Sequence, residues 1–92
     1  MKVTVHKVMV DLDAKEHVIE LPYGSKILSA KCVDHRPRVS IWYEFVKQAK
    51  PICNYKIIIC PTGPNNIKFG NEKFVDTVFW EHLVFHIYAG EV

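Results

Sequence analysis

The chain has 92 residues, of which 49% are hydrophobic and 24% are charged, and its formal net charge is +2 at pH 7. This length suits one domain, and this composition excludes wholesale disorder. The basic residues form no stripe, which argues against nucleic acid as a partner, and no apolar run approaches the roughly 18 residues of a membrane span. We therefore expect a single globular domain over residues 1–92, without a membrane partner.

The N-terminal segment predicts a strand that is interrupted once. Valines alternate with polar residues over 3–5, and they alternate in the opposite phase over 8–10. A change of phase at His6–Lys7 is what a β-bulge produces, so we predict a bulge there.

A second short strand follows the polar turn "LDAKE". In "HVIEL", the residues His17, Ile19 and Leu21 share one face. Pro22 fixes φ and Gly24 relieves the backbone, so the pair predicts a tight turn after this strand.

Two segments around a proline-containing break predict an antiparallel hairpin, with 25–34 paired to 39–47. Pro37 in "DHRPR" cannot donate to a central ladder and pushes Arg36 out of the helical region. The residues predicted to share a face are Leu28, Ala30 and Cys32 in the first segment, and Val39, Ile41, Tyr43 and Phe45 in the second.

The C-terminal half adds further strands. "YKIIIC" is dense enough in isoleucine to be buried on both faces, and "PTGPNN" predicts a break. The aromatic and β-branched tail predicts two strands with a reversal near Glu81. Six or seven short strands predict a mainly β fold, a small antiparallel β-sandwich or a partly open barrel, with at most one short helix in 44–53.

Several segments in this order resemble a family of small uncharacterised proteins found mainly in bacteriophage genomes: "ELPYGSKILSAKC", "PRVSIWYEF", "PTGPNN", "FVDTV" and "LVFHIYAGE". Two positions depart from that family's pattern, because Pro61 and Asp76 stand where it has glycine. The resemblance implies a phage origin and a role in the cytoplasm of the infected bacterial host. It supplies no catalytic residue.

Catalytic and metal sites are not predicted. In a strand, His82 and His86 lie roughly 13 Å apart, too far to share one zinc ion unaided. The cysteines, which are Cys32, Cys53 and Cys60, are odd in number and lack CxxC spacing, so we predict reduced thiols in a reducing cytoplasm, without a catalytic role. No cofactor is predicted either.

Two loops are candidate contacts for a small anionic ligand. The hairpin tip carries His35, Arg36 and Arg38, and guanidinium groups bind phosphates in a bidentate way. The turn-rich break supplies polar side chains for a ligand rim, and the strand after the tip adds an aromatic face: these residues are Thr62, Asn65, Asn66 and Trp42.

Surplus aromatic residues predict an interface, because so small a domain cannot bury them all in one core. The strand "LVFHIYA" carries no Lys, Arg or Pro to protect a free sheet edge. We therefore predict a homo-oligomer with any ligand site at the subunit boundary. The proposed interface residues are Trp80, Phe85, His86 and Tyr88.

Three functions fit these features. The first is a non-enzymatic phage accessory protein that counters host defence by sequestering a small anionic, nucleotide-type ligand. The second is a phage adaptor or inhibitor that binds a host protein through an aromatic strand face or a free sheet edge. The third is a small hydrolase or nuclease, for which the sequence offers no convincing acid–base or metal set.

Overall fold

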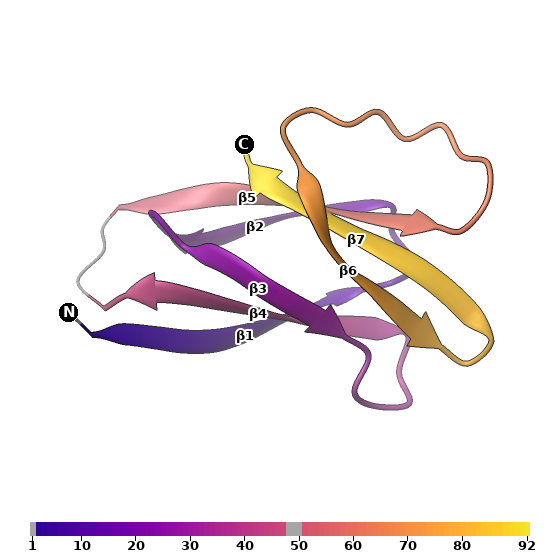
Figure 1. The fold of residues 1–92 in the computed structure, drawn as a ribbon, viewed down its shortest axis with the longest axis horizontal. Helices are drawn as coiled ribbons and strands as arrows, with labels where there is room; N and C mark the ends of the chain where they lie inside the picture. The colour runs from indigo at the N-terminus through magenta and orange to yellow at the C-terminus, as the bar shows by residue number, and fades with distance from the viewer. Residues whose placement is uncertain (1, 48–50) are drawn as a thin grey trace.

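The computed structural model describes residues 2–47 and 51–92, and the secondary structure of these residues is entirely β (Figure 1). This confirms the predicted mainly β fold. The strands are β1 (Val3–Asp11), β2 (Glu16–Pro22), β3 (Lys26–Lys31), β4 (Arg38–Val46), β5 (Ile52–Pro61), β6 (Lys73–Trp80) and β7 (Leu83–Glu91).

The strands form two antiparallel sheets, with the orders β1-β4-β3 and β2-β5-β7-β6. The predicted hairpin is confirmed as β3 paired with β4, and the tail forms β6 and β7 with its reversal at Glu81, whose φ is 55°. Gly24 has a φ of 81°, a value that favours glycine, in the tight turn predicted after β2.

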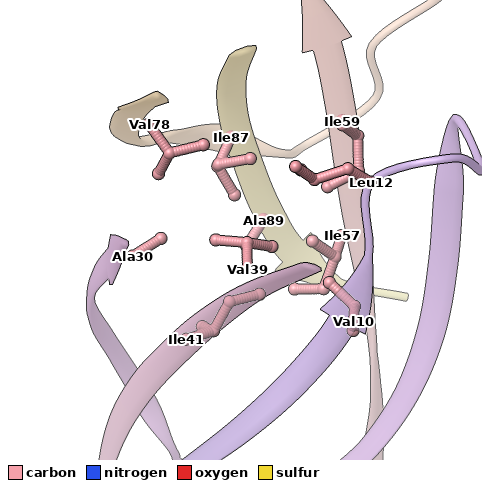
Figure 2. Packing of buried hydrophobic residues seen from close by; sticks show 10 residues of the cluster. All are labelled: Val10, Leu12, Ala30, Val39, Ile41, Ile57, Ile59, Val78, Ile87 and Ala89. Carbon is pink, nitrogen blue, oxygen red and sulfur yellow. The ribbon is translucent and has the colours of Figure 1, made fainter. Parts of the chain in front are cut away.

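The core lies between the two sheets, where side chains from both meet (Figure 2). Ile57 and Ile59 of β5 face this core, and Ile58 on the opposite face of the strand is only 1% exposed. The prediction that "YKIIIC" is buried on both faces is therefore confirmed. The core cluster is Val10, Leu12, Ala30, Val39, Ile41, Ile57, Ile59, Val78, Ile87 and Ala89.

The predicted bulge at His6–Lys7 is wrong. The β1–β4 register runs without a shift from the Val3–Val46 pair to the Asp11–Arg38 pair. The valines change phase because β1 carries apolar residues on both faces: Val10 faces the core, whereas Val5 is 53% exposed on the outer face of its sheet.

A bulge occurs instead in β3, between Ile27 and Ser29. It brings Ile27 against the core and leaves Leu28 39% exposed, so the prediction that Leu28 shares the buried face of Ala30 is wrong. The short helix allowed in 44–53 is not found in the described part of that range, of which 44–46 belong to β4 and 52–53 to β5. Residues 48–50 of that range lie outside the described residues.

The strand "LVFHIYA" is not a sheet edge, so that premise of the oligomer prediction is wrong. β7 is hydrogen-bonded to β5 on one side and to β6 on the other. The edge strands are β1 and β3 in one sheet and β2 and β6 in the other.

The β5–β6 loop, residues 62–72, packs back on the outer face of the four-stranded sheet. The ring of Phe69 lies 4.5 Å from that of Tyr88, between centroids. Asn71 donates a hydrogen bond from its side-chain amide to the carbonyl of Glu91 at 2.8 Å. Gly90 permits this approach, since a Cβ there would lie 2.9 Å from the Cα of Glu72.

Within the described residues, no helix is long and apolar enough to cross a membrane.

Candidate anion-binding groove

A groove of about 360 Å³ lies where the β1–β2 turn, the outer face of β5 and the β5–β6 loop meet. We call it the lysine groove, because lysine is its commonest residue. Its lining consists of Lys15, Glu16, Lys56, Ile58, Asn66, Ile67 and Lys68.

Three separate segments place the lysines. The β1–β2 turn holds Lys15, and the backbone N–H of Ile59 donates to the Lys15 carbonyl at 2.8 Å, which ties this turn to β5. Lys56 points outward because side chains alternate along a strand and Ile57 faces the core. Lys68 comes from the β5–β6 loop. The groove therefore depends on the loop keeping its place on the sheet.

The residues that line the groove carry a net positive charge, and the carboxylate of Glu72 outside the lining also acts on Lys56. The Nζ of Lys56 lies 3.0 Å from Oε2 of Glu16, and this hydrogen bond raises the pKa of Lys56 and keeps it charged. Three lysines and one glutamate in the lining leave two net positive charges. Lys15 and Lys68 therefore supply the charge that Glu16 does not offset.

Apolar and amide groups complete the lining. Ile67 is half-buried and offers hydrocarbon surface, whereas Ile58 is almost fully covered. The side-chain amide of Asn66 can donate hydrogen bonds. Ammonium groups beside one apolar side chain suit a phosphate or carboxylate attached to a flat apolar body. The described lining holds no cysteine, serine, threonine or histidine, so it offers no nucleophile–base pair.

The predicted hairpin tip is a separate place in the fold. The guanidinium of Arg38 donates two hydrogen bonds to Oδ2 of Asp34, at 2.6 and 3.0 Å, and the backbone N–H of Arg36 donates to Oδ1. The bond from Arg38 is the main cause that lowers the pKa of Asp34. His35 receives the indole N–H of Trp80 on its carbonyl at 3.2 Å. Arg38 is thus engaged within the chain, and no tip residue lines the lysine groove.

Of the predicted rim residues, only Asn66 lines the lysine groove. Thr62 lies with its Oγ1 2.9 Å from Nε2 of His86. The side-chain amide of Asn65 donates to Sγ of Cys60 at 3.2 Å and to the carbonyl of Gly63 at 3.1 Å. These contacts fix the start of the β5–β6 loop to the sheet.

Cys60 and His86 are opposite each other on β5 and β7. Both ring nitrogens of His86 are nevertheless engaged by hydroxyl groups, Nε2 by Thr62 and Nδ1 by Thr77 at 3.0 Å. The cysteine sulfur receives the Asn65 amide. The imidazole is therefore not placed to take the thiol proton, and the arrangement is structural.

The proposed interface residues make contacts within the chain. Phe85 packs against the core, and the Tyr88 ring lies between those of Phe69 and Phe74. Trp42 is half-buried on β4. The most exposed aromatic residue is Phe79 on β6, at 65%, which was not among the predicted interface residues.

The cysteines are free thiols in this structure. Burial raises the pKa of Cys32 and of Cys53, and the nearby carboxylates of Asp34 and Glu91 raise them further. No group of three or more metal-ligating side chains occurs among the residues that the structure describes.

We predict slow thiol chemistry as a consequence. A raised pKa lowers the thiolate fraction at neutral pH, so Cys32 and Cys53 should react with an aromatic disulfide more slowly than the cysteines of the unfolded chain, and faster as pH rises. The variants Cys32→Ser and Cys53→Ser assign each kinetic phase. A native thiol that reacts faster than the unfolded chain would contradict this prediction.

The sequence did not single out the three lysines of the groove. They stand 41 and 12 positions apart in a turn, a strand and a loop, and only the pairing of β2 with β5 brings the first two together. One feature of the sequence could have indicated the groove: Lys56 is the only charged residue in the otherwise apolar segment "YKIIIC".

The family model described as "Domain of unknown function (DUF7352)" matches residues 1–92, the whole chain. No curated protein and no solved structure matches this chain.

Proposed function

The chain belongs to the DUF7352 family, and we propose that it binds a small anion in the lysine groove without chemical conversion of the ligand. The observation that carries this proposal is the convergence of Lys15, Lys56 and Lys68 on one groove that contains a single carboxylate.

The ligand class follows from the lining. An acidic group, such as a phosphate, binds between the free ammonium groups of Lys15 and Lys68, and Asn66 donates to one of its oxygens. A flat ring attached to that group packs on Ile67. A mononucleotide combines both features, which is why we propose a nucleotide-type ligand.

The ion pair of Lys56 with Glu16 sets the orientation. Glu16 repels an anion from its own side of the groove, so the acidic group lies nearer to Lys68 and the loop. Because the hydrogen bond to Glu16 raises its pKa, Lys56 stays charged to a higher pH than an ordinary lysine.

The groove lies within one chain, so this proposal needs no second subunit. The sequestration of a nucleotide signal stays a prediction, and so does the phage origin that the resemblance implies. So does a ligand site at a subunit boundary.

The test is a calorimetric titration of the protein with adenosine monophosphate, inorganic pyrophosphate and uncharged adenosine. We expect saturable binding of the two anions, weaker binding at high salt because exposed charges are screened, and little binding of adenosine. Each of Lys15→Glu and Lys68→Glu should weaken anion binding by about tenfold or more, since hydrogen bonds to charged groups contribute about 1.5–3 kcal/mol.

Lys73→Glu is the matched control, because Lys73 is exposed on β6 and does not line the groove. It makes the same change in net charge and should leave binding within about twofold, as expected for screened surface charge. Equal losses in all three variants would show nonspecific attraction and reject the groove as the site.

Adaptor binding to a protein is a second candidate, supported by Phe74 and Phe79, which are exposed on the edge strand β6. A partner held there would lose affinity with Phe79→Ser and keep it with Lys68→Glu. The two variants thus separate the two functions.

A further inference from the structure

β1 is a long sheet edge with little protection. Among the described residues, β1 pairs only with β4, over nine residues without a register shift. In Figure 1 it runs along the outside of the three-stranded sheet. Val3, Val5 and Met9 are exposed along it, and Lys7 is its only lysine. Edge strands of this kind are templates for pairing with another strand.

The other three edges are protected. β2 carries Glu16, Glu20 and Pro22. β3 is six residues long, contains a bulge, and has a lysine at each end. β6 is bulged between Phe74 and Asp76 and lies beside β3, whose Ala30 N–H donates to the Asp76 carboxylate. Bulges, charges, proline and cover are the usual protections of a sheet edge, and β1 has almost none of them.

The backbone of β1 presents alternate residues to the free side. The Leu12 N–H donates to the Pro37 carbonyl beside β4. The backbone N–H and C=O groups of even-numbered β1 residues therefore point toward β4, and those of odd-numbered residues point away from it. The carbonyl of Asp11 is accordingly taken on the free side by Nε2 of His17, at 2.7 Å. The N–H and C=O groups of Val3, Val5, Lys7 and Met9 remain for a partner strand.

We propose that β1 pairs with β1 of a second copy of this chain, antiparallel, about a two-fold axis at His6. This register places Val5 opposite Lys7 of the second copy and Val3 opposite Met9 of the second copy. Two copies of the three-stranded sheet then form one six-stranded sheet.

Charge and hydrogen bonding select this register. An axis at Lys7 sets two lysines opposite each other, which destabilises a strand pair. An axis at Val8 or Met9 requires the Asp11 carbonyl that His17 already occupies. An axis at Val5 pairs only residues 3–7. The axis at His6 uses the N–H and C=O groups of Val3, Val5, Lys7 and Met9. It also sets apolar side chains opposite each other in the Val3–Met9 pair and opposes no like charges on the outer face.

Sedimentation equilibrium across the micromolar range tests this proposal with two substitutions at one exposed site. Val5→Lys faces Lys7 of the second copy twice in each dimer, and it should weaken the dimer by about tenfold or more. Val5→Glu faces the same two lysines, and it should leave the dimer at least as tight as the wild type. Val5 is 53% exposed, but it lies opposite Glu44 of its own β4, so Val5→Glu should cost some stability and Val5→Lys should not. The unfolding free energy of both variants is therefore measured beside their mass.

Val18 provides the matched control, because it is exposed on the guarded edge strand β2. Val18→Lys and Val18→Glu should leave the mass of the wild-type particle unchanged. A wild-type monomer throughout the range, or equal behaviour of Val5→Lys and Val5→Glu, would overturn the proposal. A loss of the dimer in the Val18 variants but not in Val5→Lys would also overturn it, since the contact between copies would then lie on β2.

Discussion

Replacing Gly90 by alanine is expected to lift the β5–β6 loop off the four-stranded sheet. The new Cβ would lie 2.9 Å from the Cα of Glu72 and 3.0 Å from the carbonyl oxygen of Asn71, and both are backbone atoms that cannot rotate away. Overpacking of this kind costs about 1–3 kcal/mol of unfolding free energy. Because the same loop carries Lys68 into the lysine groove, anion binding should fall by about tenfold, the equivalent of roughly 1.4 kcal/mol.

Chemical denaturation and calorimetry check the two effects on one sample. Gly70→Ala is the control, since Gly70 belongs to the same loop but its Cβ would meet only the Glu72 side chain at 3.5 Å. That variant should keep both stability and binding. If Gly90→Ala binds anions as tightly as the wild type, the loop does not contribute to the site.

Replacing Asp76 by alanine is expected to destabilise the fold where the two sheets meet. β3 and β6 lie beside each other, and the Ala30 N–H donates to Oδ2 of Asp76 at 3.2 Å. Ala30 is fully buried, so the loss of this acceptor leaves a buried N–H donor without a partner. Oδ1 also receives the Thr77 N–H at 2.9 Å. An unsatisfied buried group costs about 1–3 kcal/mol, which is the loss of unfolding free energy we expect.

Asp76→Asn separates the hydrogen bond from the charge, because an amide keeps one acceptor oxygen. It should recover at least half of the lost stability in a denaturant titration. Asp13→Ala removes an exposed carboxylate from the β1–β2 turn and should change stability by no more than about 0.5 kcal/mol. If Asp76→Ala were as stable as the wild type, water would accept the hydrogen bond of the Ala30 N–H in the variant.

The alternation of apolar and polar residues predicted most of the strands, because a strand with one buried face carries apolar residues at every second position. β2 follows this rule with Ile19 and Leu21. In β4 the core residues Val39 and Ile41 alternate as predicted, although Ser40 between them is buried as well. β1 breaks it, because the outer face of the three-stranded sheet is uncovered and still carries valine and methionine. A strand that is apolar on both faces and a bulged strand give the same pattern, which is why the bulge was misplaced.

Strand order was beyond the sequence. The unprotected composition of "LVFHIYA" was read as an edge, but β7 is flanked by β5 and β6, where it has no edge to protect. Long-range pairing decides which strand is exposed, and neither periodicity nor propensity encodes it. Of the strands that the structure describes, β1 is the long edge with little protection, and it is there that we propose the contact between copies.

The candidate site was predictable only in part. Asn66 was expected at a ligand rim, and an anionic ligand was expected, but the cations were sought at the hairpin tip. At the tip, Asp34 lies four residues before Arg38 and forms an ion pair with its guanidinium. The lysines that remain come together only through the β2–β5 pairing and the packing of the loop.

The most direct measurement is a two-dimensional amide NMR titration of the labelled protein with inorganic pyrophosphate. Binding in the lysine groove predicts saturable shifts at Lys15, Lys56 and residues 66–68, and Lys68→Glu should move their midpoint to an about tenfold or higher pyrophosphate concentration. Saturable shifts confined to the hairpin tip at residues 35–38, or no saturable shift at all, would contradict the proposed site.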